Sequence, residues 1–144
     1  MEKPWIRFSK WPYEESMLYF EVEASDGSYV ASQDFFADLS DLLEFGQGLV
    51  AFPRVQSDQV LFQAGKNDPG WAHWVSIRVY CYDAVGHGAI EVEVNNNKKG
   101  THGRQAQFTI RTEVASIDRL GQGLVTWLDG KEPTLQVRLT SERA

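Results

Sequence analysis

The sequence predicts an α+β fold in which a β-β-β-α-β unit occurs twice, so that about eight mostly antiparallel strands form a sheet with two helices packed on it and an internal pseudo-two-fold. The first observation is a repeated phrase: Phe45–Phe52 (FGQGLVAF) returns as Leu120–Trp127 (LGQGLVTW). The second is period-two alternation of apolar and polar residues before each phrase, and the third is a helical period of apolar residues that runs through both phrases. At 144 residues the chain fits a single domain, 1–144.

The first unit is expected to span residues 5–64. Its strand Leu18–Glu23 alternates apolar residues with Glu21 and Glu23, so that one face is buried and the other carries carboxylates. Asp26 and Gly27 form a tight-turn signal, after which a third strand leads to the helix. The sequence also predicts a strand at Ile6–Phe8 and a strand at Val60–Ala64. Between them it predicts a helix that Asp38 caps and Pro53 follows.

The second unit is expected to span residues 74–139. Its strands are predicted around Val75–Cys81, Ile90–Val94, Ala106–Ile110 and Leu135–Val137, with a helix that Gly130 ends. Glu91 and Glu93 occupy the places of the two glutamates of the first unit. The turn after them is longer, because the polar loop Asn95–Gly103 is inserted there, and insertions collect in surface loops.

Gly46 and Gly121 lie in the middle of the two apolar helical stripes. A glycine there costs about 1 kcal/mol of helix propensity relative to alanine, which indicates a close approach of the helix backbone to a neighbouring element. We interpret both glycines as helix–sheet packing positions. The alternative, a phosphate-binding loop, lacks the third glycine and the strand-turn-helix placement of such loops.

Composition and charge exclude several classes of protein. Fourteen Lys and Arg stand against twenty Asp and Glu, a net charge of −6, which favours a basic protein partner and speaks against direct nucleic-acid binding. No apolar run approaches the roughly 20 residues that span a bilayer, and the N-terminus lacks a signal-peptide pattern, so a cytoplasmic location and no membrane partner are expected. The single Cys81 is interpreted as a small core residue.

The residues that usually carry chemistry do not form a recognisable set. His73, His87 and His102 are not at metal-ligand spacing from one another, and the sequence contains no nucleophile motif. The glutamate pairs occupy equivalent positions in the two units, whereas a glycosidase needs two carboxyl groups in different environments. We therefore expect no enzyme activity, no metal and no cofactor.

Two groups of residues are candidates for partner binding. The first is the set of outward glutamates, for which a solvated sheet face with Arg7 and Arg78 is the competing interpretation. The second is the turn Lys66–Trp71, where Trp71 and Asp68 form the best candidate for an exposed aromatic contact; capping of the local core is the alternative there. The partner-binding residues predicted are Glu21, Glu23, Glu91, Glu93, Trp71 and Asp68.

The layout of the chain resembles small bacterial immunity proteins of the wall-associated-protein type, which protect a cell from its own polymorphic or contact-dependent toxin. The similarity covers roughly Trp5 to Leu139: an N-terminal strand with a tryptophan, hairpin strands that lead to a Leu-rich helix, a strand at Val60–Ala64, and then a further strand set with a final helix. The resemblance implies a stoichiometric inhibitor that binds a toxin domain, often a basic nuclease. Glycines in both helices and fewer acidic residues there depart from that pattern.

Other roles stay open on the sequence alone. An accessory interaction domain would assemble through unpaired sheet edges, and a homodimer fits that role as well as the immunity role. A small-molecule-binding domain would hold its ligand in a cleft between the two repeats.

Overall fold

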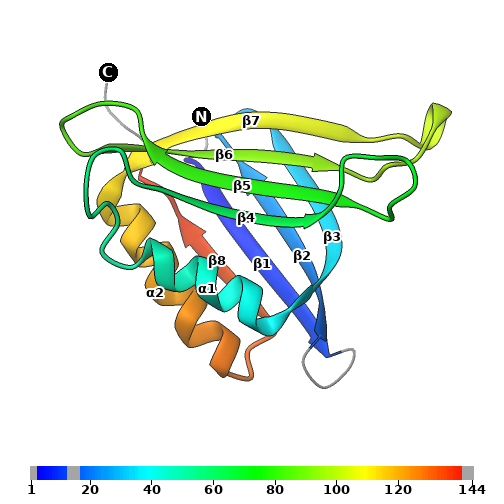
Figure 1. The fold of residues 1–144 in the computed structure, drawn as a ribbon, viewed down its shortest axis with the longest axis horizontal. Helices are drawn as coiled ribbons and strands as arrows, with labels where there is room; N and C mark the ends of the chain where they lie inside the picture. The colour runs from blue at the N-terminus through cyan, green and yellow to red at the C-terminus, as the bar shows by residue number, and fades with distance from the viewer. Residues whose placement is uncertain (1–2, 13–16, 141–144) are drawn as a thin grey trace.

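A computed structural model describes residues 3–12 and 17–140 of the chain (Figure 1), so the outermost residues of the predicted domain 1–144 lie outside the description. The strands of the first half are β1 (Trp5–Pro12), β2 (Met17–Ser25), β3 (Val30–Asp38) and β4 (Gln59–Gly65), with α1 (Leu39–Leu49) before β4. Those of the second half are β5 (Trp74–Cys81), β6 (His87–Asn95), β7 (Gln105–Glu113) and β8 (Thr134–Arg138), with α2 (Val114–Asp129) before β8. The predicted α+β class, with eight antiparallel strands and two helices, is confirmed.

The strands form two sheets of four, where the sequence predicted a single sheet. Sheet A has the order β3-β2-β1-β8 and sheet B the order β4-β5-β6-β7. Each helix carries the chain from one sheet to the other, since α1 leads from β3 of sheet A to β4 of sheet B and α2 leads from β7 of sheet B to β8 of sheet A. The last strand of each half therefore completes the sheet of the other half. The halves share one order of elements, while duplication itself remains an interpretation of the sequence.

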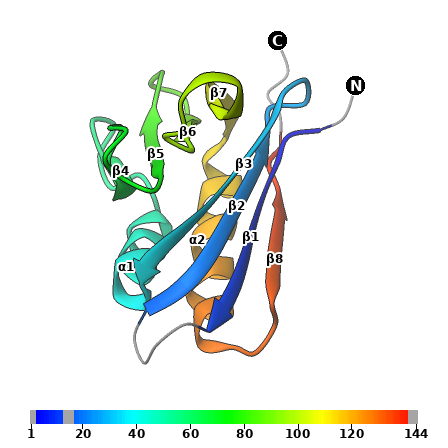
Figure 2. The same ribbon diagram turned by 90° about the vertical axis from the view of Figure 1, so that its right-hand side faces the viewer.

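The two sheets cross each other, and the helices lie side by side next to them. Figure 2 shows sheet B over one part of the inner face of sheet A and α1 and α2 over the rest. A single hydrophobic cluster draws side chains from both sheets and both helices. Phe20 stacks on Phe35 at 5.5 Å between ring centroids, Trp127 of α2 lies 6.2 Å from Phe20, and Phe62 of sheet B lies 5.6 Å from Phe35. This aromatic chain joins the layers.

The glycines of the repeated phrase lie where the two helices meet, which corrects the prediction that Gly46 and Gly121 pack against a sheet. A Cβ added to Gly121 would stand 2.8 Å from the carbonyl oxygen of Gly46 and equally close to the Cβ of Leu49. A Cβ added to Gly46 would stand 3.0 Å from the Cβ of Leu124. The close approach is therefore helix to helix, and it is closest at Gly121.

The second glycine of each phrase has the sheet-packing role. A Cβ on Gly48 would lie 3.0 Å from Val60 of β4, and one on Gly123 would lie 3.3 Å from Leu135 of β8. Each Gly-x-Gly thus brings its helix against the partner helix and against the strand that follows.

The predicted start of the first helix and the predicted end of the second are confirmed in position. Asp38 stands at the N-cap of α1 without a capping hydrogen bond from its side chain, and Gly130 stands at the C-cap of α2. Among the described residues, neither helix has the length and apolar character needed to cross a membrane.

Candidate protein-binding surface

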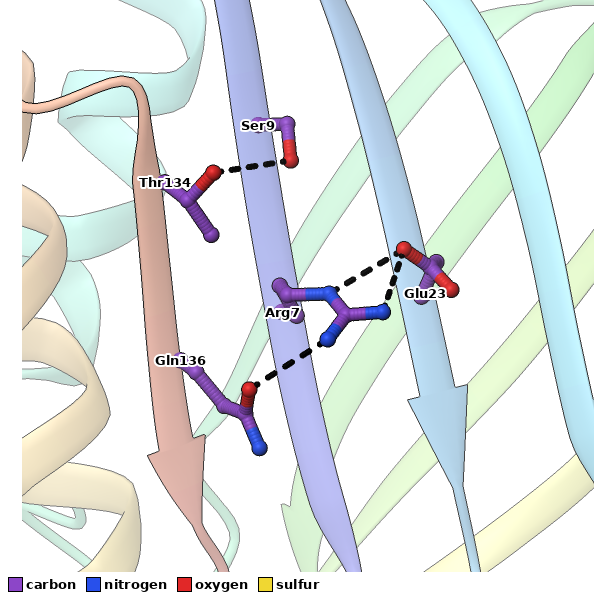
Figure 3. Close-up of polar contacts among 5 residues, drawn as sticks. All are labelled: Arg7, Ser9, Glu23, Thr134 and Gln136. Carbon is purple, nitrogen blue, oxygen red and sulfur yellow. Dashed lines mark hydrogen bonds and ion pairs between the residues drawn. The ribbon is translucent and has the colours of Figure 1, made fainter.

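The outer face of sheet A carries the first pair of predicted glutamates. Arg7 donates to the Glu23 carboxylate from Nη2 at 2.7 Å and from Nε at 3.1 Å, and its Nη1 reaches the side-chain oxygen of Gln136 on β8 at 3.4 Å (Figure 3). On the next row, the hydroxyls of Ser9 and Thr134 are 3.4 Å apart. Arg7 thus forms an ion pair with Glu23 and links three strands of the sheet.

The outer face of sheet B carries the second pair. Arg78 Nη2 lies 3.3 Å from the Glu91 carboxylate, and the indole N–H of Trp74 donates to Glu93. Both glutamates of sheet B therefore have a partner within the protein.

The four glutamates do not form one surface. The inner faces of both sheets are buried in the shared core, so their outer faces look away from each other (Figure 2). A single flat partner surface can cover Glu21 and Glu23, or Glu91 and Glu93, but not all four.

Glu21 differs from the other three. Strand pairing places it between Ser9 on β1 and Asp34 on β3. Within the described ranges the ion pairs are Arg7–Glu23, Arg78–Glu91 and His87–Asp83, so neither Glu21 nor Asp34 belongs to one. Partial burial raises the pKa of Glu21, the neighbouring Glu23 raises it further, and Arg7 offsets part of the rise.

A row of aromatic side chains lies beside these two carboxylates. Trp11, Tyr19 and Phe36 are paired across β1, β2 and β3, with ring centroids 5.7 Å and 4.8 Å apart. Both end residues of the row face solvent from the outer side of the sheet: Trp11 is 46% exposed and Phe36 is 38% exposed. We call these three residues the aromatic row.

The aromatic row was not among the contact residues predicted from the sequence. The position of Tyr19 could have been found, because alternation along its strand places Tyr19 on the same face as Glu21 and Glu23. The contribution of Phe36 needed the pairing of β2 with β3, which the alternation pattern does not specify.

The other predicted contact residues lie on the loop between β4 and β5. Trp71 is 49% exposed, and the Lys66 ammonium lies 5.1 Å from its ring centroid. Asp68 accepts the backbone N–H of Gly70 at 2.7 Å, and the Asn97 amide of the inserted loop donates to the carbonyls of Lys66 and Trp71. These contacts order the loop and join it to the inserted loop between β6 and β7.

The side chains of His73 and His87 make contacts within the fold. His73 Nε2 accepts the backbone N–H of Phe36 at 3.1 Å and so ties β3 to the segment before β5, and burial lowers the pKa of His73. His87 Nδ1 lies 2.5 Å from Asp83 in the hairpin between β5 and β6. Residues 3–12 and 17–140 contain no group of three His, Cys, Asp or Glu arranged to hold a metal ion. Burial raises the pKa of the Cys81 thiol, followed by the effect of Asp83.

No protein-family model, curated protein or solved structure matches the chain.

Proposed function

We propose that this protein is a non-catalytic protein-binding module of the immunity type, which binds a cognate toxin domain of basic, nuclease-like character in the cytoplasm and blocks it without turnover. The observation that supports this most is the outer face of sheet A, where Glu21 and Asp34 lie side by side next to three aromatic rings. Exposed aromatic side chains are typical anchors of protein interfaces.

Charge indicates the kind of partner. Carboxylates outside an ion pair, on a protein of net charge −6, attract a positively charged protein and steer its approach. The same charge repels phosphates, so a direct nucleic-acid ligand is the poorer fit.

Self-association is the second candidate, and one observation favours it. β7 is a nine-residue strand at the edge of sheet B, and it pairs only with β6 among the described strands. An edge of that length can accept a strand from a second copy. Light scattering on the purified protein tests this role, since a dimer is expected if β7 pairs and a monomer would exclude it.

The test of the immunity role is capture of the partner from a lysate of source cells with tagged protein, at low and at high salt, followed by mass spectrometry. Recovery of one basic toxin domain, retained better at low salt and neutralised by the protein when both are co-expressed, is the expected result. Recovery of no protein besides the bait, or a captured toxin that stays active, would remove this proposal.

A matched pair of variants links capture to the face. Glu21→Lys with Asp34→Lys reverses two charges on sheet A, and Glu44→Lys with Glu132→Lys makes the same change of net charge at exposed positions outside both sheets. We expect the first variant to lose at least about tenfold in association rate and the second to lose little, because steering depends on where the charge lies. Equal losses would mean that only net charge matters.

A further inference from the structure

Sheet B contains a compact unit of one arginine, one aromatic ring and one carboxylate. The Arg78 guanidinium lies 4.2 Å from the Tyr80 ring centroid while it pairs with Glu91 at 3.3 Å. Such an arrangement joins a cation–π contact to a charged hydrogen bond on one side chain. On sheet B the protein's own arginine thereby bridges this ring and this carboxylate.

Strand pairing identifies the corresponding positions of sheet A. Glu21 and Glu23 take the places of Glu91 and Glu93, and the residue opposite Glu21 is Ser9, whereas the residue opposite Glu91 is Arg78. Two residues further along, Trp11 stands where sheet B has Tyr80. Sheet A therefore has the aromatic ring and the carboxylate of the unit, with a serine in the place of the arginine.

Arg7 does not fill that place. It lies one row away, over the Trp5 ring at 5.1 Å and in an ion pair with Glu23 at 2.7 Å. Alternate residues on one face are about 7 Å apart along a strand, so an arginine engaged in that way does not also cover Trp11.

The rest of the row enlarges the surface on sheet A. Tyr19 and Phe36 stand beside Trp11, where sheet B has the buried Ala89 and the exposed Arg111, and Asp34 stands beside Glu21, where sheet B has Thr109. At these corresponding positions sheet A thus combines three rings with two carboxylates, and sheet B combines one ring with two arginines and the carboxylate of Glu91. At these positions sheet A carries negative charge and sheet B carries positive charge, which favours a cation on sheet A.

We infer that the aromatic row and the carboxylates of Glu21 and Asp34 form a docking surface for an arginine side chain of a basic protein partner, which completes on sheet A the unit that Arg78 completes on sheet B. This inference rests on the proposed function in that the partner is a protein. Arginine fits better than lysine, because a planar guanidinium stacks on a ring while its N–H groups donate to a carboxylate.

The experiment is an NMR titration of the labelled protein with a capped Gly-Gly-Arg-Gly-Gly peptide, and with its lysine counterpart as the comparison. We expect the peptide to shift the indole N–H of Trp11 and the carboxyl carbon of Glu21, and the lysine peptide to bind several-fold more weakly. The indoles of Trp71 and Trp74 serve as internal controls. Shifts centred on those residues, or spread over all carboxylates alike, would overturn the inference.

Ser9→Arg supplies the missing arginine within the chain and should weaken peptide binding at least about tenfold. Ser76→Arg adds the same charge on sheet B opposite Glu93 and should leave peptide binding unchanged. Wild-type affinity in a folded Ser9→Arg protein would contradict the inference. If Ser9→Arg does not fold, Trp11→Leu is the second variant, and the same loss of affinity is expected from it.

The two proposals can fail separately. Capture of a toxin that Ser9→Arg does not weaken would leave the proposed function standing and remove the arginine site. Peptide binding at Trp11 without capture of any toxin would leave the arginine site standing and remove the proposed function.

Discussion

The outer faces of the two sheets are built on the same strand pairing and differ in what they carry. On sheet B, Arg78 lies across Tyr80 and Glu91 within the protein. On sheet A, the corresponding positions hold Ser9, Trp11 and Glu21, and the ring of Trp11 stays 46% exposed. The arginine that bridges a ring and a carboxylate on sheet B is thus replaced by a serine on sheet A, and Asp34 and Phe36 stand where sheet B has Thr109 and Arg111.

Outward glutamates at equivalent sequence positions therefore do not make equivalent contacts. Glu23, Glu91 and Glu93 each contact an internal donor, and Glu21 stands beside a second acid. The competing interpretation from sequence, a solvated face with Arg7 and Arg78, describes Glu23 and Glu91 well. Among the described residues, Glu21 has no ion pair with either arginine, and Arg7 offsets only part of the rise in its pKa.

The largest effect is expected at the helix crossing, where the two halves also differ. Gly121→Leu should destabilise the protein by about 2 kcal/mol and lower the Tm by several degrees, because the backbone of α1 stands in the way of the new side chain. Gly46→Ala should cost less, since the Cβ of Leu124 is the nearest atom and can shift slightly. Thermal unfolding of both variants measures the difference, and a neutral Gly121→Leu would mean that the helices do not approach as described.

A smaller effect is expected at the link between the sheets. Because burial lowers the pKa of His73, the unfolded chain binds the proton more readily, so stability is lost as the pH falls through the unfolded value of about 6.5. Protonated Nε2 cannot accept the N–H of Phe36, although the nearby Asp34 favours the proton.

The check is urea unfolding of wild type and His73→Ala at pH 7.5 and pH 5.5. The variant should lose roughly 1 kcal/mol at the higher pH and show a weaker dependence on pH than wild type. An identical dependence in the two proteins would exclude His73 as its source.

The smallest effect on stability is expected at Glu21 and Glu91, which occupy corresponding positions on the two sheets. The raised pKa of Glu21 means that folding favours its protonated form, so the stability that this form contributes is lost as the pH rises through the raised pKa. Glu21→Gln should therefore be neutral or slightly stabilising at pH 7. Glu91→Gln should cost a few tenths of a kcal/mol, since it weakens the partly exposed pair with Arg78. Equal changes in the two unfolding curves would mean that the faces do not differ in this respect.

Much of the fold could be predicted because local patterns determine it. Alternation in Leu18–Glu23 and Ile90–Val94 correctly placed strands with one face buried, and Asp38 and Gly130 correctly marked helix ends. Glu21 was predicted as a surface residue from the same alternation. The partner-binding role of the glutamates, of Trp71 and of Asp68 stays a prediction.

The register between matched strands could not be predicted. In sequence, Ile6-Arg7-Phe8 is similar to Ile77-Arg78-Val79, a match that would align Arg7 with Arg78. Strand pairing, with Glu21 and Glu91 superposed, instead aligns Arg7 with Ser76. A shift of two residues keeps every side chain on its face, so the hydrophobic pattern is equally satisfied by both alignments. Only the pairing revealed that Ser9 and Arg78 correspond.

By itself, the sequence determined the class of the fold, the order of its elements and the face on which each strand carries its acids, because these follow from periods of two and 3.6 residues along one segment. The tertiary structure decided that the last strand of each half joins the other sheet, that Gly46 and Gly121 meet each other, and that Glu21 lies beside Asp34 and the aromatic row. Those contacts join residues far apart in the chain, and no local period records which segments will lie together.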